Sequence, residues 1–151
     1  MYRAVQDGGA AMRVVAEREV AADPARLWEV LADPAGWPRW TRSIREIRVL
    51  DGDLSAGSRG RIVQPRLPPM VWTVTEFVPG RELTWIAASA GVRTTGTHSV
   101  RPGPVGSRLR LGLAQDGALA PLVAALLGGR TRRYVEWEAD GLRRAAESPA
   151  R

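Results

Sequence analysis

Apolar and polar residues alternate along most of the chain, which is the pattern of β-strands with one buried face. The alternation is clearest in residues 107–114, where Leu109, Leu111 and Leu113 are separated by arginine and glycine. Other strand-like segments follow one another with proline- and glycine-rich turns between them. The predicted strands are residues 12–20, 44–50, 59–64, 71–78, 81–88, 91–100 and 107–114.

Helical patterns interrupt the strands at two places. Asp23 is a good N-cap for a short amphipathic helix, and a second short helix is predicted near residues 35–43. Leucines at helical spacing, followed by aromatic residues, predict a long C-terminal helix over residues 119–147. The Gly128-Gly129 pair inside this helix is either a hinge or a close contact between the helix and the sheet.

This order of elements predicts an α+β fold in which a strongly bent antiparallel sheet of seven strands buries one face against the long helix. The chain of 151 residues has the length of one domain, and we assign that domain to residues 12–147. We expect residues 1–11 to be a disordered leader and residues 148–151 a short tail.

Charge and composition limit the partners of this domain. The chain has 22 basic residues, all arginine, against 16 acidic ones, giving a net charge of +6. The arginines are spread along the whole chain rather than clustered on one element, so solvated faces are expected and a nucleic-acid partner is not. Apolar runs are too short for a membrane span and no signal peptide is recognisable, so we expect a cytoplasmic protein.

The residues available for chemistry are few. With one histidine and no cysteine, neither a metal site nor thiol chemistry is expected. No phosphate-binding glycine loop is present, so no cofactor is predicted.

Three segments carry a resemblance to a known superfamily. They are AEREVAADPARLWEVLADPAGWPRW, WTVTEFVPGRELTW and GTHSVRPGPVGSRLRLGLAQDGALAPLV, and the resemblance extends over about residues 12–147. The chain resembles the START-like, or helix-grip, superfamily, which includes Bet v 1-type proteins and bacterial polyketide cyclases/dehydrases. The resemblance implies a cavity between the curved sheet and the long helix that takes a hydrophobic small molecule. Periodicity alone does not predict that cavity.

Within this superfamily fold, three residues are candidates for catalysis. His98 is a candidate general acid/base, with Glu76 or Tyr134 as its support. The alternatives are a histidine satisfied by core polar groups, a rim salt bridge for Glu76, and simple packing for Tyr134.

Large apolar side chains are the candidates for the walls of the cavity. Trp72 shares a strand face with Val74 and Glu76, Trp85 shares one with Leu83, and ordinary core packing is the alternative for each. Arg61 is a candidate partner for a ligand carboxylate or enolate. The full ligand-binding set is Trp40, Arg61, Trp72, Val74, Leu83, Trp85, Leu109, Leu111, Leu126 and Trp137.

These residues favour two functions. The first is binding of a polyketide-like, aromatic or lipid molecule, with cyclisation or dehydration of a polyketide-type substrate as the reaction if the site is catalytic. The second is a non-catalytic carrier or sensor of a lipid or aromatic metabolite. A partner-binding module that uses the basic surface is a third hypothesis. A monomer and a homodimer formed through an edge strand both remain open.

Overall fold

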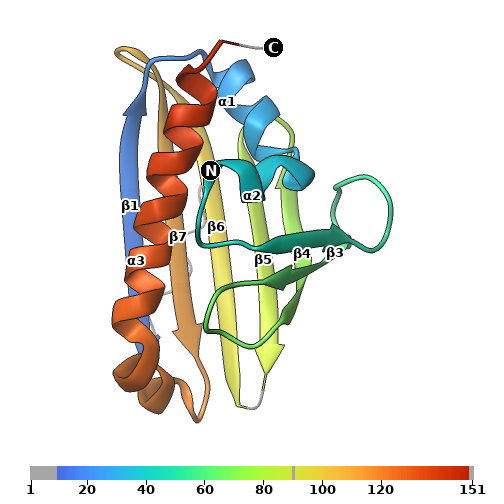
Figure 1. Ribbon diagram of the computed structural model, residues 1–151, viewed down its shortest axis with the longest axis vertical. Coiled ribbons are helices and arrows are strands. Elements are labelled where there is room, and N and C mark those ends of the chain that lie inside the picture. The colour runs from blue at the N-terminus through green and yellow to red at the C-terminus, as the bar shows by residue number, and fades with distance from the viewer. Residues whose placement is uncertain (1–9, 90, 150–151) are drawn as a thin grey trace.

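The computed structural model describes residues 10–89 and 91–149 and shows a curled sheet with a long helix lying along it (Figure 1). The predicted α+β fold is confirmed, with every predicted strand and helix present. The strands are β1 (Met12–Val20), β2 (Glu46–Val49), β3 (Arg59–Val63), β4 (Met70–Val78), β5 (Glu82–Ser89), β6 (Val92–Gly103) and β7 (Gly106–Asp116). The helices are α1 (Pro24–Leu31), a 3₁₀ turn η1 (Pro34–Gly36), α2 (Trp37–Trp40) and α3 (Ala120–Glu147). The expected leader lies mostly outside the described residues, as does the end of the tail.

All seven strands form one antiparallel sheet in the order β1-β7-β6-β5-β4-β3-β2. The first strand therefore pairs with the last, and β1 and β2 form the two edges. Figure 1 shows β2 and β3 crossing in front of β5, so the sheet curls toward the side on which α3 lies. This curl turns one face of the sheet into a concave surface.

Three short helical segments connect β1 to β2. The Asp23 carboxylate accepts a hydrogen bond of 2.8 Å from the backbone N–H of Arg26, which caps α1 as predicted. Leu27 and Leu31 of α1 are fully buried, and α1 packs against the C-terminal part of α3 and the sheet. The short helices thus cover one end of the concave surface.

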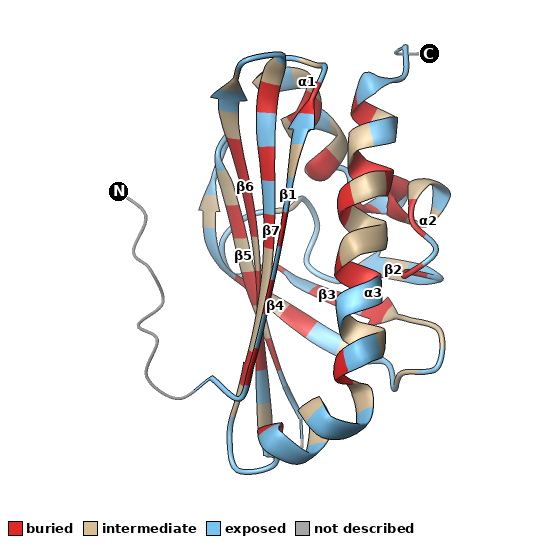
Figure 2. Ribbon diagram, turned by 90° about the vertical axis from the view of Figure 1, so that its left-hand side faces the viewer, coloured by how far each residue is buried: buried red, intermediate tan, exposed pale blue. Residues whose placement is uncertain are grey.

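Helix α3 packs mainly over β1 and β7 rather than over the middle of the sheet (Figures 1 and 2). Its buried residues Val135, Ala139 and Leu142 join the same core as the inner residues of β1 and β7. Arg18 of β1 reaches α3 and forms ion pairs with Asp140 and Glu136. This off-centre position leaves the inner faces of β4 and β5 largely uncovered by α3.

The two glycines inside α3 do not interrupt it, because the helix is continuous from Ala120 to Glu147. A methyl group added at Gly128 would make ordinary contact with Met12, and one added at Gly129 would meet nothing within 4 Å. The close helix contact lies instead at Gly141, where an added Cβ would be 2.0 Å from the carbonyl oxygen of Trp40.

Candidate functional site: a pocket between the sheet and α3

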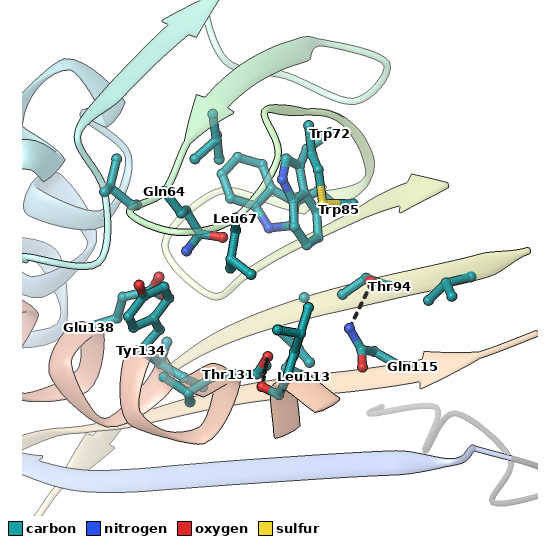
Figure 3. Close-up of a pocket in the computed structure, with 18 of the residues that line it drawn as sticks. Gln64, Leu67, Trp72, Trp85, Thr94, Leu113, Gln115, Thr131, Tyr134 and Glu138 are labelled. Atoms are coloured by element: carbon teal, nitrogen blue, oxygen red, sulfur yellow. Dashed lines mark hydrogen bonds between the residues drawn. The ribbon is translucent and has the colours of Figure 1, made fainter. Parts of the chain in front are cut away.

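A cavity of about 330 Å³ lies between the concave face of the sheet and α3. Its size falls within the range of small-molecule sites, at the lower end. One end of the cavity lies at the short helices and the C-terminal half of α3. The other end lies at the β3–β4 loop and the N-terminal half of α3. Figure 3 shows part of the lining. The lining residues from the short-helix segment, the first half of the sheet and the β3–β4 loop are Trp37, Ile44, Ile62, Gln64, Leu67, Pro68, Met70, Trp72, Trp85 and Ser89. Those from β6, β7 and α3 include Val92, Thr94, Gly96, Thr97, His98, Leu111, Leu113, Gln115, Leu119, Val123, Leu127, Thr131, Tyr134, Val135 and Glu138.

Tryptophan rings form the largest apolar wall of the pocket. The ring centroids of Trp72 and Trp85 are 5.5 Å apart, and those of Trp37 and Trp85 are 5.2 Å apart in an edge-to-face arrangement. Gly96 makes room for this wall, because a Cβ at that position would lie 2.8 Å from Nε1 of Trp85. The missing side chain in β6 therefore sets the position of a ring contributed by β5.

His98 lies at the inner end of this wall. Its Nδ1 is 3.1 Å from the carbonyl oxygen of Leu83, its cross-strand neighbour. A carbonyl only accepts hydrogen bonds, so Nδ1 carries the proton and Nε2 is an acceptor. Burial lowers the pKa of His98 from 6.5 to about 4, which keeps the ring neutral at physiological pH.

Glu138 of α3 is the carboxyl group that lines the pocket. The hydroxyl of Ser43 donates a 3.0 Å hydrogen bond to Oε1 of Glu138, and Ser43 also shares a 2.8 Å hydrogen bond with Thr41. Burial raises the pKa of Glu138 from 4.5 to about 7, and the Ser43 hydrogen bond opposes this rise. Near neutral pH a large fraction of this carboxyl group is therefore protonated and can donate a hydrogen bond.

Tyr134 lines the same part of the pocket, one helical turn before Glu138 (Figure 3). Its hydroxyl donates to the carbonyl oxygen of Pro65 in the β3–β4 loop, and its ring stacks on Trp137 at 5.4 Å between centroids. The hydroxyl proton is therefore already engaged, and the contact ties α3 to the loop across the pocket.

Five of the sequence-predicted residues line the pocket, and each comes from a different element. They are Trp72, Trp85, His98, Leu111 and Tyr134. Val74, Leu83 and Leu109 are buried in the core behind the lining, where they pack without facing the cavity.

The other predicted site residues lie elsewhere, and each has a local cause. Glu76 is exposed because the register of β4 and β5 shifts between Val74 and Glu76, so that Phe77 instead packs inward against Trp28. The prediction that Glu76 shares the inner face of Trp72 and Val74 is therefore wrong. Arg61 is also exposed, because its neighbours in β3, Gly60 and Ile62, are the residues that point inward.

On the helices, Leu126 is 72% exposed, since Val123 and Leu127 take the side of α3 that faces the pocket. Trp40 and Trp137 are half-buried outside the lining. Trp40 packs on Trp37, and the Trp137 ring carries the guanidinium of Arg42 at 4.3 Å.

Several polar lining residues were missed by the sequence interpretation, among them Glu138, Gln115 and Gln64, although two of these three had a readable signal. Glu138 follows Tyr134 by four residues and so shares its helix face. Gln115 continues the two-residue alternation of Leu109, Leu111 and Leu113. Gln64 lies in the loop after β3, where no periodicity applies.

Over residues 10–89 and 91–149, no group of three or more histidine, aspartate or glutamate side chains could hold a metal ion. Within the same ranges, no helix is long and apolar enough to cross a membrane.

Comparison with known proteins identifies the relatives of this fold. Residues 11–147 match the family model described as polyketide cyclase/dehydrase and lipid transport. No curated protein sequence matches the chain.

Three solved structures illustrate the likeness of the fold. A hypothetical protein from Helicobacter pylori, jhp0584, is similar with a TM-score of 0.80 and 16% identity over 93% of this chain and 91% of that chain. A START superfamily protein from Mycobacterium smegmatis has a TM-score of 0.67 and 19% identity, covering 87% and 97%. A norcoclaurine synthase point mutant from Thalictrum flavum has a TM-score of 0.70 and 14% identity, covering 89% and 93%. At these identities the likeness establishes the fold alone.

Proposed function

Because the chain belongs to the polyketide cyclase/dehydrase and lipid transport family, we propose that it binds a hydrophobic small molecule in the pocket between its sheet and α3. The ligand is a polyketide-like, aromatic or lipid molecule. The observation that carries this proposal is the cavity of about 330 Å³ with its wall of tryptophan rings. Burial of an apolar ligand against these rings supplies the affinity, and the few polar groups set its orientation.

The pocket can be closed by a substitution on α3 with a matched control on the same helix. Val123 lines the pocket and Leu126, three residues later, faces away from it. We expect butylbenzene to bind the unmodified chain and the Leu126→Trp variant equally in isothermal titration calorimetry. We expect the Val123→Trp variant to lose binding, because its side chain fills the space.

Equal binding of butylbenzene to both tryptophan variants, or none to the unmodified chain, would contradict the proposal. The natural ligand can then be sought by native mass spectrometry of the chain after incubation with a metabolite extract. The Val123→Trp variant is incubated in the same way as a negative control. A molecule counts as a pocket ligand only if it binds the unmodified chain and not this variant.

Glu138 favours a second candidate function, which is proton transfer on a carbonyl substrate of the polyketide type. Its protonated carboxyl group would donate to the carbonyl oxygen while Nε2 of His98 takes a proton from the adjacent carbon, giving an enol, a carboxylate and an imidazolium. Norcoclaurine synthase, which shares the fold, has been crystallised with a transition-state analogue. We rank ligand binding first, because a histidine with a pKa of about 4 is a weak base for removing a proton from carbon.

Deuterium exchange separates this candidate from a carrier or sensor. Proton NMR in D₂O would follow the α-protons of 4-phenylbutan-2-one with the chain, with Glu138→Gln and with His98→Gln. A catalyst gives exchange above the buffer rate that either substitution reduces at least tenfold. Exchange at the buffer rate for all three proteins would leave the carrier or sensor, acting in the cytoplasm, as the proposed function.

A further inference from the structure

A second polar position lies in the pocket, away from Glu138. Gln115 near the end of β7 faces Thr94 of β6, its cross-strand partner. Figure 3 shows the two side chains joined by a hydrogen bond on one side of the pocket, while Glu138 and Tyr134 lie on the other. Thr94 and His98 are four residues apart on β6, which corresponds to about 13 Å along a strand. The pocket therefore has polar groups at two separate positions.

The amide of Gln115 has unused hydrogen-bonding capacity. Its Nε2 donates a 3.3 Å hydrogen bond to Oγ1 of Thr94, while its Oε1 has no partner in the described part of the chain. Gln115 is only 8% exposed and Thr94 only 4%, so bulk water offers little compensation. A buried polar atom without a partner is unfavourable, and a ligand group that pairs with it would relieve that cost.

The surroundings of Gln115 restrict the chemistry of that ligand group. Leu113, Leu119 and Val123 are apolar residues of the same lining, and no arginine occurs among the described lining residues. An ionised carboxylate or phosphate would therefore be buried without a countercharge, which is strongly unfavourable. A neutral hydroxyl both donates and accepts, so it can pair with the amide whichever of its two atoms faces the cavity.

We propose that Gln115 and Thr94 form a hydrogen-bonding subsite that selects ligands carrying a hydroxyl group at one end of an apolar body. The inference rests on the proposed function, because the subsite lies within the proposed ligand pocket. It adds the class of ligand, which is an elongated neutral alcohol or phenol whose hydroxyl lies between β6 and β7. The rest of the ligand lies along the tryptophan wall.

Two probes that differ by one hydroxyl test this subsite by isothermal titration calorimetry on the full chain. They are 4-butylphenol and butylbenzene. We expect the unmodified chain to prefer 4-butylphenol and the near-isosteric Gln115→Met variant to bind it about fivefold to tenfold more weakly, the value of one neutral hydrogen bond. Affinity for butylbenzene should not fall in this variant.

A second variant and a matched control complete the design. Thr94→Val removes the hydroxyl that holds the amide and should reduce the preference in part, while a thermal melt of each variant confirms that it folds. Gln64→Met is the control, because Gln64 is a second glutamine of the lining and lies near Tyr134 and Glu138 (Figure 3). We expect it to leave the preference between the probes unchanged.

Three results would overturn the inference while leaving the proposed function intact. They are an unchanged preference in Gln115→Met, an equal loss for both probes, and a loss of preference in Gln64→Met instead. Failure of butylbenzene to bind the unmodified chain would overturn the proposed function and the subsite together. The two failures are distinguishable because butylbenzene has no hydroxyl.

Discussion

At the scale of single residues, the pocket reverses the usual roles of His98 and Glu138. His98 is a neutral acceptor because burial holds its pKa at about 4, and Glu138 is a hydrogen-bond donor because burial raises its pKa to about 7. Both effects have the same cause, which is that a poorly hydrated environment disfavours the charged form. At pH 7 a ligand therefore meets a neutral His98 and a Glu138 carboxyl group of which about half is protonated.

This environment predicts opposite pH dependences of stability for the two groups. The folded state holds the Glu138 proton between pH 4.5 and 7 when the unfolded chain has lost it, so the contribution of Glu138 to stability falls as pH rises through that window. The unfolded chain binds the His98 proton between pH 4 and 6.5 when the folded state does not, so the contribution of His98 rises with pH. Each change amounts to about 3 kcal/mol.

Urea unfolding between pH 4 and 8 checks both signs. Relative to the unmodified chain, we expect Glu138→Gln to gain stability as pH rises from 4.5 to 7. We expect His98→Gln to lose relative stability from pH 4 to 6.5. Parallel curves for the three proteins would show that neither group is shifted as described.

At the scale of elements, α3 is fixed by a close contact at Gly141. An alanine there would place its Cβ 2.0 Å from the Trp40 carbonyl oxygen, and backbone on both sides must move to relieve the overlap. We expect Gly141→Ala to lower the free energy of unfolding by about 2 kcal/mol or more. The matched control is Gly129→Ala on the same helix, which meets nothing within 4 Å and should stabilise by about 0.5–1 kcal/mol.

Chemical denaturation of the two alanine variants measures this difference directly. Because both substitutions improve helix propensity equally, the difference between them isolates the contact with Trp40. Similar stabilities for the two variants would mean that α3 and α2 can separate without cost.

The strands and helices also show where sequence patterns predict the inward-facing residues correctly and where they fail. The alternation in β7 placed Leu109 and Leu111 on the inner face, and helical spacing placed α3 within a residue of its observed start. In β4 the same reasoning failed at Glu76, because a register shift of one residue exchanges the two faces of a strand. No residue type in that segment marks the shift.

At the scale of the whole molecule, the pocket exists because α3 lies mainly over β1 and β7 and leaves β4 and β5 largely uncovered. Periodicity predicts which faces are apolar but not how far a helix sits from the middle of a sheet. For this reason the cavity had to be inferred from family resemblance, and Leu126 was assigned to the wrong side of its helix. The family match and the fold confirm the resemblance, while the ligand remains a proposal.

The off-centre position of α3 depends on its contacts with β1, the edge strand over which it packs. Arg18 of β1 donates a 2.8 Å hydrogen bond from Nε to Asp140 and pairs with Glu136, so one guanidinium joins the edge strand to two turns of the helix. The Arg18 side chain is partly buried, which protects these pairs from full solvent screening. The ion pair of Arg108 with Glu19, which are neighbours across β1 and β7, is longer at 3.8 Å and exposed.

We therefore expect Arg18→Gln to lower the free energy of unfolding by about 1–2 kcal/mol and Arg108→Gln to change it by less than about 0.5 kcal/mol. Hydrogen exchange should show faster opening of β1 amides in Arg18→Gln, because the edge strand loses its tie to α3. The difference between the two variants should shrink in 1 M salt, where the screening length is about 3 Å. Equal effects of both substitutions would indicate that apolar packing alone holds α3 against this edge and sets the width of the pocket.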